Sequence, residues 1–88
     1  MIKVALTANL QKYFPKSKFE IEANSILDLL KKMDQMQNHF SSYILEDNKS
    51  VRKHVNIFID GQLLPKSETS RQLVAGQTIH IMQALSGG

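Results

Sequence analysis

The stretch Val55-Asn56-Ile57-Phe58-Ile59-Asp60-Gly61 decides the fold of this 88-residue chain. Large apolar residues occupy every second position from Val55 to Ile59, which is the period of a strand with one buried face. Asp60-Gly61 then predicts a two-residue hairpin turn, because a type I′ turn needs positive φ at both central positions. The chain returns through residues 62–64, and Pro65 ends this strand because proline has no N–H for a sheet ladder. The stretch therefore predicts a β-hairpin.

Three more stretches alternate in the same way and predict further strands. They are residues 2–7, 18–22 and 78–82. A polar connection over residues 10–17 joins the first two, which therefore predict an N-terminal hairpin. The third follows a turn at Ala75-Gly76 and predicts the last strand.

An amphipathic helix separates the two hairpins. Ser25 and Asp28 have the spacing of a capping box, in which a hydroxyl and a carboxylate accept hydrogen bonds from the free N–H groups of the first turn. One helical face then carries the apolar residues Ile26, Leu29, Leu30 and Met33. Residues 40–44 predict a second, shorter helical turn, which the polar cluster 46–48 closes.

This order of elements predicts an α+β fold of the β-grasp type. A mixed sheet of four to five strands would cover the main helix, with the short second helix beside it. This arrangement is the simplest way to bury the apolar face of the helix against the strands. We expect residues 1–82 to form the β-grasp domain and residues 83–88 to form a flexible C-terminal Gly-Gly tail.

The composition argues against several functional classes. The chain has no cysteine, which excludes disulfides and thiolate metal sites, and its three histidines are too scattered to predict a metal site. No nucleophilic triad, phosphate loop or carboxylate pair stands out, so we do not expect an enzyme. The net charge of +3 comes from dispersed basic residues, which predicts no nucleic-acid partner. The sequence shows no signal peptide or long apolar run, so we expect a soluble, cytoplasmic protein without a membrane partner.

The last six residues, Gln83-Ala84-Leu85-Ser86-Gly87-Gly88, carry the strongest indication of function. Six extended residues reach about 20 Å, which is enough to enter the active site of another protein. Glycine at the last two positions removes Cβ, so the backbone can pass through a narrow channel. From Gln72 to Gly88 there is no Lys, Arg, Asp or Glu, and apart from His80 the terminal carboxylate is the only ionisable group. These features predict a tail that is inserted into a partner and acted upon.

Two segments resemble the sulfur-carrier branch of the ubiquitin-like proteins, and the resemblance spans essentially the whole chain. The segment from Arg52 to Gly61 resembles the family's Arg-x-x-Val-Asn pattern followed by a strand and a turn. The segment from Ile81 to Gly88 resembles the family's C-terminal end, which often reads Pro-Ala-Val-Ala-Gly-Gly. This chain lacks that proline, which should loosen its tail.

The family includes the small subunit of molybdopterin synthase and the thiamine-pathway carrier. The chain is most similar to the cysteine-biosynthesis carriers and the archaeal small modifier proteins. Its length, and the segment between the main helix and Val55, resemble the cysteine and molybdopterin types more than the shorter thiamine type.

The resemblance implies a carrier that partner enzymes act upon. An E1-like enzyme would use ATP to adenylate the carboxylate of Gly88, and a sulfurtransferase or sulfide would displace AMP to leave a thiocarboxylate. An acceptor synthase would then take the sulfur, and the chain itself would bind no cofactor. Gly88 and Gly87 would form the activated end, and Ser86, Leu85 and Ala84 the rest of the tail.

The alternation of the strands also predicts a partner surface. If Val55, Ile57 and Ile59 face the helix, Phe58 points to the opposite face of the sheet. The same alternation places Ala5, His80 and Met82 on that face. We expect Ala5, Phe58 and Met82 to form an apolar docking patch, with His80 beside it. The alternative is that Phe58 is covered by loops of its own chain or exposed singly.

Arg52, which matches the family segment, is a further candidate partner residue. A solvated charge at the end of a strand is the alternative interpretation of this side chain.

Three functions stay open for the chain as a whole. They are a sulfur carrier, a modifier that forms isopeptide bonds through Gly88, and a noncatalytic interaction module whose Gly-Gly end is incidental.

Overall fold

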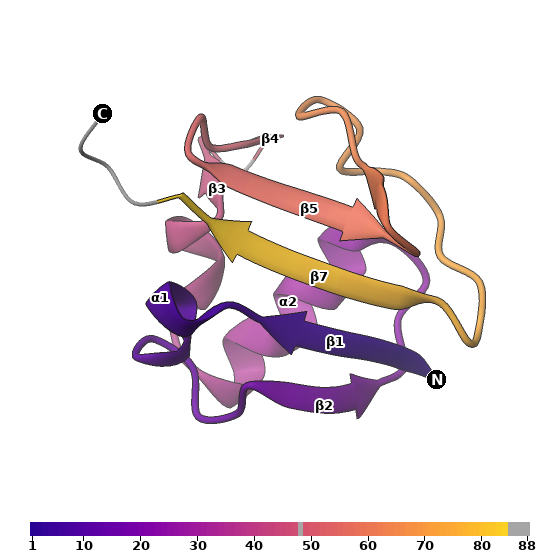
Figure 1. Cartoon of the computed structure of the whole chain (residues 1–88), viewed down its shortest axis with the longest axis horizontal. Helices are drawn as coiled ribbons and strands as arrows, with labels where there is room; N and C mark the ends of the chain where they lie inside the picture. The colour runs from indigo at the N-terminus through magenta and orange to yellow at the C-terminus, as the bar shows by residue number, and fades with distance from the viewer. Residues whose placement is uncertain (48, 85–88) are drawn as a thin grey trace.

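The structure, a computed structural model, describes residues 1–47 and 49–84. Its elements are β1 (Ile2–Leu6), α1 (Ala8–Gln11), β2 (Lys18–Ile21), α2 (Ile26–Met36), the 3₁₀ helix η1 (Phe40–Tyr43), β3 (Leu45–Glu46), β4 (Ser50–Val51), β5 (Val55–Ile59), β6 (Gln62–Leu63) and β7 (Thr78–Gln83). Five of these strands form one sheet in the order β2-β1-β7-β5-β6, and β3 pairs with β4 in a separate ribbon (Figure 1). A mixed sheet over one main helix confirms the predicted fold class.

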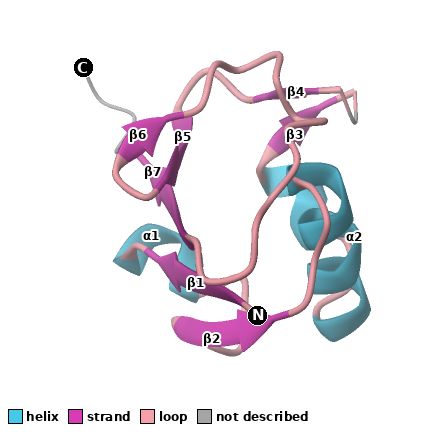
Figure 2. Ribbon diagram, turned by 90° about the vertical axis from the view of Figure 1, so that its right-hand side faces the viewer, coloured by secondary structure: helices cyan, strands magenta, loops and turns pink. Residues whose placement is uncertain are grey.

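The last strand of the chain lies in the middle of the sheet. β7 pairs in parallel with β1 and antiparallel with β5, while β2 and β6 complete the two sides. Helix α2 packs on one face of this sheet and leaves the other face without a helical layer (Figures 1 and 2). The β5–β6 hairpin turns at Asp60 and Gly61, which both have positive φ, as the sequence predicted.

The core lies between the sheet and α2. The predicted apolar face of α2 is buried: Ile26, Leu29, Leu30 and Met33 are each at most 1% exposed. From the sheet, the inward residues of β5 and β7 are buried as well, including Ile57, Ile79 and Ile81. The alternation of these strands therefore identifies the buried face correctly.

The capping of α2 differs in one detail from the predicted capping box. The N–H of Asp28 donates to Ser25 Oγ at 3.1 Å, as expected, but Asp28 Oδ2 accepts from the N–H of Asn24 at 2.9 Å. This backbone hydrogen bond, together with the nearby Lys32 ammonium, lowers the pKa of Asp28 below its ordinary value. The long loop before β7 completes the cap, because its carbonyls at Thr69 and Arg71 accept from Leu27 and Ile26.

Two features of the structure are absent from the sequence prediction. The connection over residues 10–17 is not merely a loop, since its beginning belongs to the short helix α1, which buries Leu10, and Phe14 is buried just beyond it. In the polar cluster predicted after η1, Glu46 belongs to β3 and Asp47 follows it at positive φ, while residue 48 lies outside the described residues. Strands of two residues and a helix of four are too short for a periodic pattern to identify them. The predicted short helical turn over residues 40–44 is confirmed, as the 3₁₀ helix η1.

Within the described residues, every helix is too short or too polar to cross a lipid bilayer.

Truncating the buried face of α2 should destabilise the whole domain. We expect Leu30→Ala to lower the free energy of unfolding by about 2–5 kcal/mol, because it removes apolar contacts and leaves a cavity. Lys31→Ala, one position further on the exposed side of the same helix, should change it by less than about 0.5 kcal/mol. Urea denaturation of both variants measures the difference, and equal stabilities would contradict the packing of α2 described here.

Candidate functional site

The predicted functional end of the chain leaves the domain at the end of β7. The structure describes this path as far as Ala84, and the predicted tail residues Leu85, Ser86, Gly87 and Gly88 lie outside the described residues. The described part of the site therefore consists of the base of the tail and the surfaces next to it.

One side of the tail base is held by the segment that joins β1 to α1. The N–H of Thr7 donates to the Ile81 carbonyl at 3.2 Å, which continues the β1–β7 ladder by one residue. The Thr7 hydroxyl then accepts from the N–H of Gln83 at 3.3 Å. Asn9 Nδ2 donates to the Gln83 carbonyl at 3.0 Å. Two side chains thus take over the last hydrogen bonds of β7 where β1 has already ended.

The other side of the tail base is held by the start of β5. Val55 pairs with Gln83, and the N–H of Ala84 donates to the His54 carbonyl at 2.8 Å. The backbone is therefore fixed on one side through Gln83 and on the other through Ala84. Of the tail predicted over residues 83–88, Gln83 therefore belongs to β7 and Ala84 is hydrogen-bonded to the domain.

The predicted partner residues on the sheet are brought together by the strand register. Ala5, His80 and Phe58 are direct neighbours across β1, β7 and β5, and Met82 lies opposite Asn56, two residues further along β7. Met82 is 41% exposed and His80 is exposed, whereas Ala5 and Phe58 are half-buried. These four side chains share the face of the sheet that α2 does not cover, which we call the outer face.

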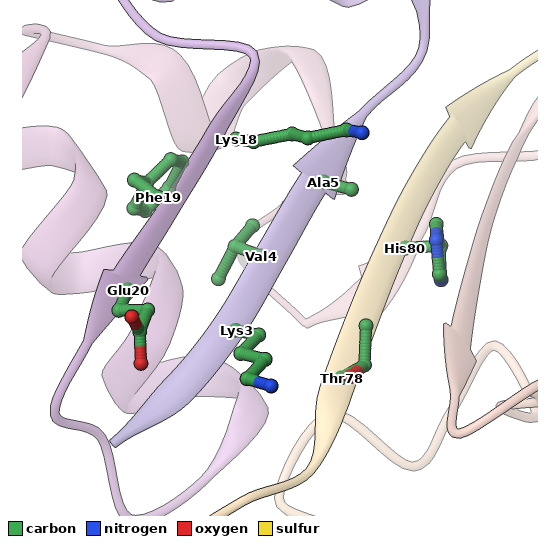
Figure 3. Close-up of a pocket in the computed structure, with 8 residues that line it drawn as sticks. All are labelled: Lys3, Val4, Ala5, Lys18, Phe19, Glu20, Thr78 and His80. Carbon is green, nitrogen blue, oxygen red and sulfur yellow. The ribbon is translucent and has the colours of Figure 1, made fainter.

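The row on the outer face continues beyond these residues at both ends. Lys18 of β2 lies opposite Ala5, and Leu63 of β6, which is 56% exposed, lies opposite Phe58. A shallow depression lies beside the row over β2, β1 and β7 (Figure 3). Its rim carries charged and polar side chains, including Lys3, Glu20 and Thr78. The outer face is therefore apolar around Phe58 and polar around the depression.

Arg52 does not belong to the outer face. Its Nε donates to the Ser42 carbonyl at 2.9 Å and its N–H donates to the Ile44 carbonyl at 2.8 Å, so that it is bound to η1 and the residue after it. It lies two residues before His54, whose carbonyl holds Ala84. The structure thus separates Arg52 from the sheet patch and connects it to the base of the tail.

Four residues at or near the site escape sequence reasoning. Thr7, Asn9 and the His54 carbonyl hold the tail base, and Lys66 lies beside Asn56 on β5. Lys66 Nζ donates to Asn56 Oδ1 at 2.8 Å and to the Val55 carbonyl, and burial lowers its pKa below the ordinary value. His54 and Asn56 lie in the family segment from Arg52 to Gly61, but the sequence predicted no role for either residue at the tail base.

Over residues 1–47 and 49–84, no three His, Asp or Glu side chains gather in a way that could hold a metal ion.

A family model described as the ThiS family matches residues 4–88 of this sequence. No curated protein matches the chain.

The fold is similar to several solved structures that share few identical residues with it. A chain of the BexX/CysO complex from Amycolatopsis orientalis superposes with a TM-score of 0.86 at 12% identity, over 100% of both chains. The small archaeal modifier protein 1 from Methanosarcina acetivorans gives a TM-score of 0.79 at 22% identity, over 99% of this chain and 95% of that one. Urm1 from Sulfolobus solfataricus gives 0.72 at 21% identity, over 93% and 99%. At these identities the likeness establishes the fold.

Removing the Asn9 side chain should loosen the base of the tail. We expect Asn9→Ala to speed amide hydrogen exchange at Gln83 and Ala84 by up to about tenfold, because a hydrogen bond of this kind contributes about 0.5–1.5 kcal/mol. Gln11→Ala is the matched control, since Gln11 Nε2 donates at 3.0 Å to the Leu6 carbonyl of β1 and not to Gln83. Exchange rates that are the same in both variants, measured by NMR, would refute the role of Asn9.

Proposed function

Since the chain belongs to the ThiS family, whose model matches residues 4–88, we propose that it is a sulfur carrier that works through the C-terminal carboxylate of Gly88. Proteins of this family act with E1-like activating enzymes and with synthases, and they are generally not catalytic themselves. The reactive group is then supplied by the carrier, and the catalytic groups are supplied by its partners.

The proposed reaction has two steps on Gly88. The carboxylate attacks the α-phosphorus of ATP in the activating enzyme, which forms an acyl-adenylate and releases pyrophosphate. Sulfide then attacks the acyl carbon, AMP leaves, and a thiocarboxylate remains. If the persulfide of a sulfurtransferase attacks instead, AMP leaves and an acyl disulfide forms, which a second thiol reduces to the thiocarboxylate while it forms a disulfide with the sulfurtransferase. The chain has no cysteine, so its side chains offer no thiol that could hold the sulfur instead.

The observation that carries this proposal is the way in which the chain leaves the domain. β7 is held on both sides, through Gln83 and Ala84, and only residues 85–88 follow. Four extended residues reach at most about 14 Å. Ser86 is the only side chain with a polar atom among them, and Gly87 and Gly88 have no side chain at all. A firmly held base followed by a slender, uncharged peptide suits delivery of one carboxylate into the active site of a partner.

The outer face supports the proposal as a second contact with partners. Phe58 and Met82 lie next to each other on the strands that lead to the tail base, so an enzyme that receives the tail has an apolar anchor close by. A related fold is recorded in a complex, that of BexX and CysO from A. orientalis. By analogy, we expect the outer face to bind the activating enzyme or the acceptor synthase.

We further propose an acceptor of the cysteine or molybdopterin type. The segment between α2 and β5 supports this assignment, because it is long enough to hold η1 and the β3–β4 ribbon. The length of this segment is the feature in which the chain resembles the cysteine-type and molybdopterin-type carriers.

Mass spectrometry of the intact protein tests the proposed chemistry. After co-expression with the E1-like enzyme of the same genome and a sulfurtransferase, we expect a mass gain that equals replacement of one oxygen by sulfur, located at Gly88 in the C-terminal fragment. Deletion of Gly87 and Gly88 should abolish the gain while the fold is retained.

Other outcomes of the same experiment contradict a sulfur carrier. Ladders of proteins joined to Gly88 without a thiocarboxylate would favour a protein modifier. An unaltered terminus, or a mature chain that continues past Gly88, would favour an interaction module with an incidental Gly-Gly sequence.

Charge on the outer face should weaken the partner complex. We expect Phe58→Asp to raise the KM of the carrier in pyrophosphate release by roughly thirtyfold, as loss of about 2 kcal/mol at an aromatic anchor implies. Val74→Asp is the control, because Val74 is an exposed apolar residue in the loop before β7. An unchanged KM for Phe58→Asp would argue against docking, and an unfolded variant would show that Phe58 serves the core.

A further inference from the structure

A pair of stacked tyrosines lies near the base of the tail. The rings of Tyr13, just after α1, and Tyr43, in η1, have centroids 4.2 Å apart and planes inclined by 18°. Lys12 Nζ lies 5.2 Å from the centroid of the Tyr13 ring. Tyr43 is 41% exposed, so that the stack is accessible from solvent. Tyr13 is half-buried and packs against the edge of the core, whereas Tyr43 lies on the solvent side of the pair.

Hydrogen bonds connect this aromatic pair to the tail base on both sides. On one side, α1 leads from Asn9, which donates to Gln83, directly to Lys12 and Tyr13. On the other side, Arg52 Nε donates to the carbonyl of Ser42, next to Tyr43. Two residues after Arg52, the His54 carbonyl holds Ala84. These contacts form a path that starts at Gln83, passes through the two tyrosines and returns to Ala84, where the chain leaves the domain.

We call five of the side chains along these contacts the tail collar. They are Lys12, Tyr13, Tyr43, Arg52 and His54. Figure 1 shows α1, the end of β7 and the start of β5 at the same end of the molecule, where the chain leaves the domain. The collar is thus distinct from the outer face of the sheet, which lies to the side of this end.

The collar is a cationic surface. Two of its five members are permanently charged, Lys53 follows Arg52 as a further exposed cation, and none of them is acidic. Asp34 of helix α2 accepts from Ser41 N and Oγ at 2.7 and 2.6 Å. Within the described part of the chain, the side-chain ion pairs are Lys32–Asp28 and Arg71–Glu68, and neither includes a collar residue.

The short tail makes contact between this surface and the partner unavoidable. Residues 85–88 reach at most about 14 Å beyond Ala84, so the Gly88 carboxylate can enter a buried active site only if the rim of the entrance comes close to the tail base. The collar is joined to that base through the His54 carbonyl, which accepts from the N–H of Ala84. Arg and Tyr are also the residue types that contribute most to protein interfaces.

We propose that the tail collar docks onto an acidic rim around the tail-binding channel of the adenylating enzyme. This inference rests on the proposed function and adds the surface by which the partner is recognised. The cations attract the rim before contact and orient the tail, and the exposed tyrosine stack packs against the rim once the tail is inserted. The contribution is to binding, because no collar side chain takes part in the chemical step.

Charge reversal in the collar tests this proposal. Pyrophosphate release is measured with the E1-like enzyme that adenylates the wild-type chain, as a function of carrier concentration and at two salt concentrations. For Lys12→Glu combined with Arg52→Glu we expect the KM at low salt to rise by at least about tenfold, with kcat within about twofold of the wild-type value. The wild-type KM should rise with salt, and the KM of the variant should not.

A second pair of substitutions separates a local effect from a change in net charge. Lys31→Glu combined with Lys49→Glu makes the same change in net charge at two exposed lysines outside the collar, and we expect its KM to stay within about twofold of the wild-type value. Arg52→Glu also removes the hydrogen bond to the Ser42 carbonyl, so Lys12→Glu is measured alone as well. The single variant tests the collar if the double variant does not fold. Thermal unfolding of each variant shows whether the fold is kept.

The outcomes distinguish the collar from the proposed function. If the wild-type chain is not adenylated at all, the proposed function fails and the collar fails with it. If the wild-type chain is adenylated but folded collar variants show the KM of the control, the collar alone is refuted. Binding of a single-stranded RNA that the collar variants lose, with no change in KM, would also refute it and would assign these cations to nucleic acid.

Discussion

The position of β7 between β1 and β5 is the constraint on which the rest of the structure depends. The last strand of the chain is a central strand, so its backbone groups are paired on both sides along most of its length. Its inward residues, Ile79 and Ile81, are fully buried against the α2 side of the sheet. The end of the chain therefore cannot separate from the domain without breaking the ladders on both sides of the strand.

This constraint fixes the backbone at the point where the chain leaves the sheet. β1 ends before β7 does, and the side chains of Thr7 and Asn9 replace the ladder for the last residue of the strand. On the other side, the His54 carbonyl extends the pairing with β5 by one residue, to Ala84. The described backbone is therefore held on one side as far as Gln83 and on the other as far as Ala84.

The two surfaces next to the tail differ in their physical character. The outer face is apolar around Phe58 and Met82, and its residues are neighbours because the strand register aligns them. The tail collar is cationic and aromatic, and its residues come from the turn after α1, from η1 and from the segment before β5. An apolar anchor stabilises a complex after contact, whereas charges act over a longer range and depend on salt. The chain thus offers one surface for affinity and one for orientation.

The sequence by itself determined the elements with a strong local pattern. The alternation from Val55 to Ile59, the Asp60-Gly61 turn and the apolar face of α2 each repeat over enough residues to be identified, and each was found as predicted. The ThiS-type family and the Gly-Gly end were also readable from the sequence. Local patterns suffice here because burial on one face of a strand or helix fixes the period of the apolar residues.

Only the tertiary structure decided how the end of the chain is held. Asn9 and Gln83 are 74 residues apart in sequence, and their hydrogen bond exists because α1 lies beside the end of β7. A helix of four residues shows no period of its own, so neither α1 nor its contact with β7 could be predicted. The same holds for Arg52, which the sequence predicted as a partner residue or a solvated charge at the end of a strand, and which the structure binds to η1. Such contacts depend on the packing of distant segments, and that packing follows from the whole core and not from any one stretch of residues.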